Sequence, residues 1–193
     1  MKFVMLTFLS FCLGILSSIV AAVLYERHKA KRAYAHLQAL TGYWFEFIPK
    51  SEGRNYSIGK FQYNQHKKSY TFDGANYKND GEVFCTWEST HVHSDFENRK
   101  IYYIFRASLK GALHAENYGF GVVNITEDAN GLLIPVSGHY IETKEDAKPY
   151  THSMERLEKI IEDLSLKQDR EDVDAFHSRL IQRYHTHRQF LDR

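Results

Sequence analysis

Residues 100–108 read KIYYIFRAS, and the alternation in this stretch decides the fold class. Successive side chains of an extended strand point to opposite faces, so alternate residues share a face. The two faces carry Ile101, Tyr103 and Phe105 on one side and Tyr102, Ile104 and Arg106 on the other. Both faces are therefore partly apolar. A sheet with one face in water does not need this pattern, so it indicates a strand that is covered on both sides.

Short aromatic segments of the same kind recur between residues 41 and 151, separated by clusters of Gly, Asn, Asp and Lys. Seven predicted strands cover residues 42–48, 57–65, 69–73, 83–91, 100–108, 117–126 and 132–141, and an eighth is expected near Tyr150. Turns such as Asn79-Asp80-Gly81 and Asp128-Ala129-Asn130-Gly131 indicate an antiparallel meander. Closing about eight strands removes the exposed edges and leaves an interior that is filled or holds one small ligand. We predict a mainly β fold, a small antiparallel barrel at residues 41–153.

Two glycines, Gly119 and Gly121, fall on the same face of one predicted strand. Glycine weakens a flat strand, so the pair indicates sharp strand curvature or the close approach of a ligand. A second interpretation is that the glycines leave room for neighbouring aromatic rings. The sequence leaves both open.

The N-terminal segment is predicted to be a transmembrane helix at residues 1–25. No charged residue occurs from Phe3 to Tyr25. About 22 helical residues span roughly 33 Å, enough for a hydrocarbon core of about 30 Å. The basic segment ERHKAKR follows at residues 26–32, and such a flank stays on the cytoplasmic side. The alternative is a secretory signal peptide removed after Ala22, because small residues occupy positions 17–22.

Small residues recur at every fourth position of the apolar segment. These residues are Ser10, Gly14, Ser18 and Ala22. They form a stripe on which a second helix backbone approaches closely, which predicts a homo-oligomer, although chance explains the stripe equally well. Residues 26–40 are predicted to continue as a helical linker, because no Gly or Pro interrupts residues 27–40.

The C-terminal tail, residues 154–193, shows apolar residues at helical spacing. They are Met154, Leu157, Ile160, Ile161 and Leu164, followed by Val173, Phe176, Leu180, Tyr184 and Leu191. We expect two helices, or one helix interrupted near residues 168–169. An apolar stripe of this kind more often docks on its own domain than on a partner, so we expect the tail to cover the barrel.

Composition argues against several functions. The 25 Lys and Arg balance 24 Asp and Glu, which disfavours duplex nucleic acid as a partner. Cys12 and Cys85 fall in the apolar segment and in a strand, so no disulfide is implied. No nucleophile motif, phosphate-binding loop or pair of carboxylates occurs, so we predict neither an enzyme nor a cofactor. The pairs His91/His93 and His185/His187 lack further ligands at metal-binding spacing and are better explained as surface histidines.

Five short motifs resemble the membrane-tethered β-barrel receptors of bacterial anti-phage signalling, the β-strand-rich effectors that accompany nucleotide cyclases in CBASS-type operons. The motifs are LTGYW at 40–44, WES at 87–89, YYIF at 102–105, YGFG at 118–121 and LIPVSGHY at 133–140. The resemblance covers roughly residues 1–155. It implies that the barrel binds a cyclic nucleotide made after infection, that the receptors assemble through their membrane segments, and that the bacterial inner membrane loses integrity. The chain departs from the family in having one membrane segment instead of two, and in its long tail.

The leading hypothesis is a single-pass inner-membrane receptor without catalytic activity, with its barrel in the cytoplasm. We expect Tyr70, Trp87 and Tyr103 to stack on a cyclic nucleotide or dinucleotide, and Arg106 and His139 to make polar contacts with it. Arg106 alternates out of phase with Tyr103, so a bulge is needed to bring them together. Two alternatives remain: a lipocalin-like carrier of an apolar ligand, marked by a lack of converging cationic side chains, and a protein-interaction module with a filled barrel.

Overall fold

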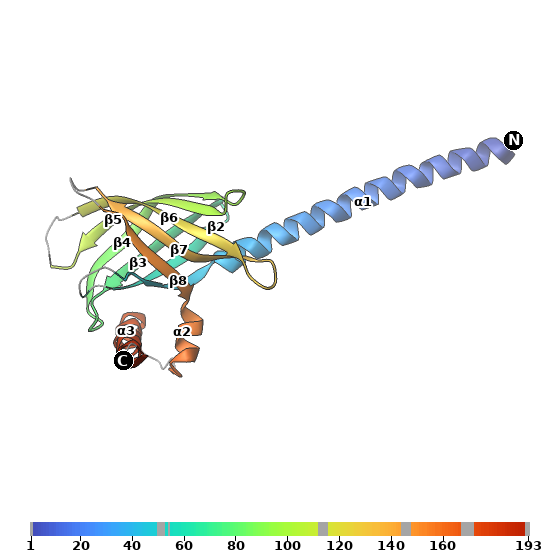
Figure 1. Ribbon diagram of the computed structural model, residues 1–193. Coiled ribbons are helices and arrows are strands. Elements are labelled where there is room, and N and C mark those ends of the chain that lie inside the picture. Colours follow the sequence, from blue (N-terminus) through green and yellow to red (C-terminus); the bar gives the residue numbers. More distant parts are fainter. Residues whose placement is uncertain are drawn as a thin grey trace. The chain divides into compact units, whose positions relative to one another are not determined.

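Eight antiparallel strands form a closed barrel in which each strand is hydrogen-bonded to the next and β8 pairs with β1 (Figure 1). The computed structural model describes residues 2–49, 53, 55–111, 116–143, 148–166 and 172–191, and it leaves out the side chains of residues 2–12, 30, 32–34, 190 and 191. The strands are β1 (Gly42–Phe47), β2 (Tyr56–Asn64), β3 (Ser69–Tyr77), β4 (Val83–Asp95), β5 (Lys100–Leu109), β6 (Glu116–Glu127), β7 (Leu133–Glu142) and β8 (Tyr150–Arg156). The predicted barrel and its antiparallel meander are confirmed.

Strand β5 alternates as its sequence predicts, with Ile101, Tyr103 and Phe105 buried inside the barrel. The expectation that it is covered on both sides is wrong: Ile104 on the outer face is 46% exposed, because α2 and α3 pack against β1 to β3 instead. Some strand ends differ from the prediction. Strand β3 continues four residues further, to Tyr77, because Tyr77 pairs with Tyr56 of β2. Pairing across a barrel thus extends strands beyond the stretch in which the sequence alternates.

Gly119 and Gly121 make room for aromatic rings of the neighbouring strand. Of the two interpretations that the sequence leaves open, the structure supports this one. Gly119 lies opposite Phe105 and Gly121 lies opposite Tyr103 across the β5–β6 pair. A Cβ atom at either glycine would overlap the ring of its partner. The missing side chains therefore let two large rings lie across the inside of the wall.

Residues Met1–Gln38 and Ala39–Arg193 form two separate units. The first consists of helix α1 (Lys2–Leu40) as far as Gln38, and residues 26–40, which are predicted to be a helical linker, are helical. Over the described residues, no helix has the length and the apolar character that crossing a bilayer requires. The expected membrane segment falls partly outside this description, since the side chains of residues 2–12, including Ser10 of the predicted stripe, are not described.

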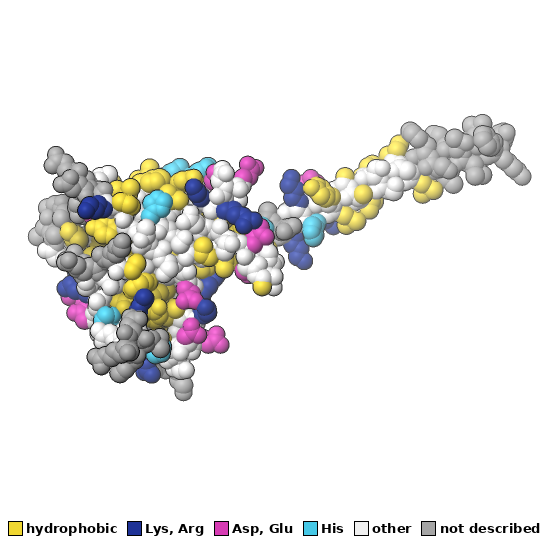
Figure 2. Space-filling model, viewed as in Figure 1, with side chains coloured by type: hydrophobic (Ala, Val, Ile, Leu, Met, Phe, Trp, Pro, Cys, Tyr) yellow, Lys and Arg dark blue, Asp and Glu magenta, His cyan; other side chains and the backbone are white. Residues whose placement is uncertain are grey.

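The described part of α1 exposes many large apolar side chains. Figure 2 shows hydrophobic side chains along the helix, next to a group of Lys, Arg and His side chains. The exposed apolar residues are Leu13, Ile15, Leu16, Ile19, Val20, Val23, Leu24 and Tyr25. Within the predicted stripe, the Ser18 hydroxyl donates to the Gly14 carbonyl oxygen at 2.9 Å, so it bonds within its own helix.

Helices α2 (Leu157–Asp163) and α3 (Val173–Leu191) cover the outer face of β1, β2 and β3 (Figure 1). The buried cluster between them contains Phe45, Tyr56, Ile58, Tyr77, Leu157, Ile160, Leu164, Phe176, Leu180 and Ile181. The prediction of two helices that dock on their own domain is confirmed. The predicted start of the tail at residue 154 is wrong, because Met154 pairs with Glu46 in β8 and its side chain is buried in the barrel.

Two tyrosine–histidine hydrogen bonds tie α3 to the barrel wall. The Tyr56 hydroxyl lies 2.8 Å from His185 Nδ1, and the Tyr77 hydroxyl lies 3.3 Å from His177 Nδ1. Burial lowers the pKa of His177 and so favours its neutral ring, whose Nδ1 atom can accept a hydrogen bond from the Tyr77 hydroxyl. The wall of β1 to β3 is therefore held by polar contacts as well as by apolar packing.

One end of the barrel is closed by Trp44 and Arg156. The Trp44 indole donates to the Leu40 carbonyl oxygen at 2.9 Å. The Arg156 guanidinium lies 4.4 Å above the Trp44 ring and donates to the carbonyl oxygens of Ala39 and Thr41. We call this the closed end. Any ligand of the interior must enter from the other end.

We predict that Leu180→Ala destabilises the barrel as well as α3. Leu180 is fully buried, and such a truncation typically costs about 2–5 kcal/mol. Urea unfolding of the full-length chain, followed by the fluorescence of Trp44 and Trp87 inside the barrel, measures this loss. Arg183→Ala, on the exposed side of α3, is the control and should change stability by less than about 0.5 kcal/mol. Equal stabilities of the two variants would mean that α3 contributes nothing to barrel stability.

Candidate functional site

The barrel interior contains a small cavity of about 20 Å³, room for about one water molecule. We call it the inner cavity, and it is lined by Glu46, Asn76, Trp87, Tyr103, Phe105 and Tyr140. A wider space of about 160 Å³ shares Asn76, Trp87, Phe105 and Tyr140 with it and reaches Phe84, Cys85, Ala107, Leu109, Asn117, Glu142 and Tyr150. These residues lie where β3, β5 and β7 end and where β4, β6 and β8 begin. The wider space is therefore the mouth of the barrel, opposite the closed end.

Aromatic rings form most of the wall of the inner cavity. The rings of Trp87 and Tyr103 are 6.2 Å apart, and those of Phe105 and Tyr140 are 5.9 Å apart. Towards the closed end, Phe61 and Phe72 stack at 3.8 Å and fill the interior. The barrel is thus filled in one half and hollow in the other, and the hollow half has flat apolar walls.

The amide of Asn76 has a fixed orientation in this wall. Its Oδ1 atom accepts a hydrogen bond from the Trp87 indole nitrogen at 3.0 Å. An indole N–H can only donate, so the amide oxygen must face Trp87. The Asn76 NH₂ group is then the end of the amide that is left to donate to a ligand.

Glu46 is a buried carboxyl group at the floor of the inner cavity. Its side chain points inward from β1 and is 3% exposed, and among the described residues its Oε1 atom has no hydrogen-bond partner. Burial raises the pKa of Glu46 to about 8, which a nearby Ser57 hydroxyl partly opposes. Glu46 is therefore mostly protonated at pH 7. A buried carboxyl oxygen without a hydrogen-bond partner costs stability, and such an atom requires a functional or structural explanation.

His152 is a second buried group without a partner. It points inward from β8, it is 3% exposed, and neither ring nitrogen is hydrogen-bonded within the part of the chain that the structure describes. Burial lowers the pKa of His152 to about 4, and His139 adds to this shift. The neutral ring lies 6.1 Å from Tyr140. Glu46 thus lines the same cavity as Tyr140, and His152 lies beside the Tyr140 ring.

The structure brings together two of the five predicted binding residues. Trp87 and Tyr103 line the inner cavity, whereas Tyr70 points into the filled half, next to Phe61 and Tyr63. Arg106 lies on the outer face of β5, where it pairs with Glu88 and Glu116. His139 lies on the outer face of β7, because it alternates with the inward Gly138 and Tyr140. The bulge that would bring Tyr103 and Arg106 together does not occur in β5, since the irregularity at this level lies in β4 between Ser89 and His91, so the out-of-phase arginine stays outside.

Sequence reasoning missed Glu46, Asn76, Phe105, Tyr140 and His152. A signal for Glu46 was present in GYWFEF at residues 42–47, since Glu46 alternates in phase with Trp44. A charged residue on the same face as a buried tryptophan is unusual for a strand wall. No comparable signal marks Asn76 or His152, because their neighbours carry no clear alternation.

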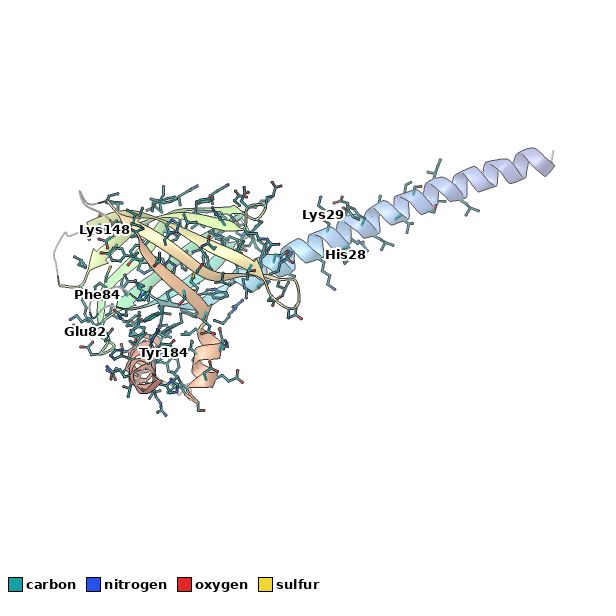
Figure 3. All side chains as sticks on the ribbon, in the orientation of Figure 1. His28, Lys29, Glu82, Phe84, Lys148 and Tyr184 are labelled. Carbon is teal, nitrogen blue, oxygen red and sulfur yellow. The ribbon has the colours of Figure 1, made fainter. Side chains whose placement is uncertain are left out.

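Lysines flank the mouth, although no Lys or Arg lines the inner cavity among the described residues. Lys110 directly follows Leu109, and Lys148 precedes Tyr150 by two residues. Figure 3 shows Lys148 and Phe84 at the same end of the barrel. Glu142 adds a negative group to the same rim.

The histidine pairs do not converge on a metal site in the described residues. His91 and His93 are both exposed on the outer face of β4, where His93 stacks on Tyr102. His185 bonds to Tyr56, and His187 lies on the exposed side of α3. Nowhere in the described ranges do three or more His, Cys, Asp or Glu side chains come together as metal ligands would.

We predict that Glu46→Gln stabilises the barrel at alkaline pH. The pKa of Glu46 is about 8 in the folded protein, against an unfolded value of 4.5. Its contribution to stability is therefore fully present below pH 4.5 and is lost as the pH rises through 8. Urea unfolding should find the variant about 4 kcal/mol more stable than the wild type at pH 8.5, and within about 1 kcal/mol at pH 5. Glu127→Gln, an exposed carboxyl, is the control. A difference that does not change with pH would contradict this account.

Comparison of the chain with protein-family models, with curated proteins and with solved structures finds no match in any of the three. The resemblance to membrane-tethered β-barrel receptors therefore stays a prediction from short motifs and element order. The barrel itself combines an open mouth, aromatic walls and a buried carboxyl group whose Oε1 atom has no hydrogen-bond partner among the described residues.

Proposed function

We propose that this protein is a membrane-tethered receptor whose barrel binds a small planar ligand, and that the ligand is a cyclic nucleotide or dinucleotide. The observation that carries the proposal is the mouth of the barrel, whose walls include the rings of Trp87, Phe105 and Tyr140 and where the Asn76 NH₂ group is left to donate.

The dimensions and chemistry of the mouth suit a nucleobase. Stacking of a base on an aromatic side chain is worth about 1–3 kcal/mol and depends little on which base is bound. Asn76, which lines the mouth, offers its NH₂ group to the edge of such a ring. The mouth, with a volume of about 160 Å³, is the space that accommodates one base, since the inner cavity of about 20 Å³ has room only for about one water molecule.

The rim of the mouth suits an anionic group better than the cavity does. Lys110 and Lys148 flank the residues of the mouth, and lysine is a common partner of phosphate. We therefore place the base between the aromatic walls of the mouth and the cyclic phosphate at its rim. Arg106 and His139, which lie outside the barrel, play no part in this arrangement.

A membrane tether is the second part of the proposal. Residues 3–25 carry no charge, and the described part of this segment exposes eight large apolar side chains, which water does not favour. The basic residues at 26–32 favour a cytoplasmic position for the barrel. We propose that ligand binding brings neighbouring chains together through Ser10, Gly14, Ser18 and Ala22 and that the assembly disrupts the bacterial inner membrane in anti-phage defence.

A lipocalin-like carrier of an apolar ligand is the second candidate. The observation that favours it is the absence of Lys and Arg among the described residues that line the inner cavity. In this case the aromatic walls alone would bind the ligand, and Glu46 would stay protonated. The two candidates differ in whether phosphate contributes to affinity.

We predict that the full-length chain in detergent micelles binds a cyclic mono- or dinucleotide and that Trp87→Leu weakens binding about tenfold, because one stacking surface is lost. Calorimetry against a panel of cyclic nucleotides measures this. Arg106→Ala, outside the barrel, is the control and should leave affinity unchanged. Binding of a long-chain fatty acid but of no nucleotide would favour the carrier, and a lack of any binding would favour the interaction module.

We predict that the mature chain keeps its N-terminal segment and stays in the membrane fraction after a carbonate wash. A reporter fused at Arg193 should be active only when the reporter functions in the cytoplasm. Gly14→Ile should reduce self-association in a bilayer, because the isoleucine side chain keeps helix backbones apart. A mature N-terminus directly after Ala22, or a reporter active only outside the cytoplasm, would exclude the tether.

A further inference from the structure

Helix α3 carries a basic face that its packing on the barrel does not use. The apolar side of the helix packs on β1, β2 and β3. On another side, an open hollow of about 480 Å³ is lined by Arg179, Gln182, Arg183, Thr186 and His187. These residues recur at helical spacing, so they share one side of α3. We call these five residues the basic face.

The positive charges of the basic face are not balanced within α3. The helix contains one acidic residue, Asp174, which lies in the first turn. Arg179 and Arg183 are four residues apart, and like charges at this spacing repel each other and destabilise a helix. The helix dipole favours cations in the last turn, where Arg188 lies, so it does not account for this pair. An anion from outside the helix would remove the repulsion.

The neighbouring turn of the barrel does not supply that anion. The Gln182 side-chain amide donates to the carbonyl oxygen of Asp80, in the turn between β3 and β4. The Asp80 carboxylate accepts the backbone N–H of Glu82 at 2.9 Å, and the Glu82 carboxylate pairs with Lys78. Arg183 is exposed and forms no ion pair within the described ranges. Its charge is therefore available to a ligand.

The donors of the basic face suit a phosphate group. A guanidinium presents its N–H groups in a planar fork that matches two phosphate oxygens. Arg179 and Arg183 are about 6 Å apart along the helix axis, so both can reach one group. His187 adds a ring nitrogen one turn further, whereas the Thr186 hydroxyl already donates to the Gln182 carbonyl oxygen at 2.9 Å. Two guanidinium groups favour a ligand group with two negative charges.

We infer that the basic face of α3 binds a phosphate monoester. A monoester carries a charge of about −1.5 to −2 at pH 7, which balances the two guanidinium groups, whereas a diester carries one negative charge. The inference does not depend on the ligand of the barrel, because the basic face lies outside the mouth. A soluble compound and a lipid headgroup both present this group, and the experiment separates these two sources.

The test titrates the full-length chain in zwitterionic micelles at about pH 7.5 and constant ionic strength, by calorimetry. The soluble arm uses inorganic phosphate and glycerol 3-phosphate, and the lipid arm uses micelles that contain phosphatidic acid. Binding in the soluble arm supports a soluble monoester, and binding in the lipid arm alone supports a headgroup. Dimethyl phosphate, a diester, should bind about tenfold more weakly than glycerol 3-phosphate.

Arg183→Ala is the diagnostic variant, because an exposed side chain can be removed without unfolding α3. It should weaken phosphate binding about tenfold, since one charged donor group is lost. Arg183→Lys should weaken binding less, because it keeps the charge and loses the planar fork. Arg106→Ala, on the outer face of β5, removes the same charge elsewhere and should bind as the wild type does.

Equal binding by the wild type and Arg183→Ala would overturn the inference, because phosphate would then be bound elsewhere, for example by the lysines beside the mouth. A lack of binding in both arms would also overturn it. Neither result bears on the proposed function, which is tested by cyclic nucleotides and by Trp87→Leu in the mouth.

Discussion

Closure of the barrel by the β1–β8 pair is the constraint on which the rest of the structure depends. The pair is short, and residues 44–47 of β1 are opposite residues 153–156 of β8. It brings Glu46 opposite Met154 and Trp44 opposite Arg156, so that the inward side chains of the first and last strands meet. Without this pair, both strands would expose an edge, and neither the closed end nor the floor of the cavity would exist.

The outer face and the interior of the closed barrel are packed in different ways. Outside, β1 to β3 carry an apolar face that α2 and α3 cover, which adds a second core to a barrel that is only partly filled. Inside, the half near the closed end is filled by stacked rings, whereas the half near the mouth is hollow. The filled half and the helical cover provide stability that the hollow half does not, and this separation is what allows a cavity in so small a barrel.

Glu46 lowers the stability of the barrel in which it lies. Its carboxyl group is buried, and its Oε1 atom has no hydrogen-bond partner among the described residues, so stability falls at neutral and alkaline pH. An apolar or amide side chain would remove this loss. Proteins retain buried ionisable groups most often at sites that bind or react.

The sequence by itself determined the local elements, because these depend on alternation, helical spacing and turn residues within a few positions. The alternation in residues 100–108, the turns at residues 79–81 and 128–131, and the apolar stripe of the tail all predicted what the structure has. Only the tertiary structure decided which face of each strand is inside and which inward residues meet. Trp87 and Tyr103 come from paired strands, but Glu46, Asn76 and Tyr140 reach the same cavity from β1, β3 and β7. Arg106 follows the inward Phe105 by one residue and therefore points outward. Contacts between strands so distant along the chain depend on the register and closure of the whole barrel, which no local pattern encodes.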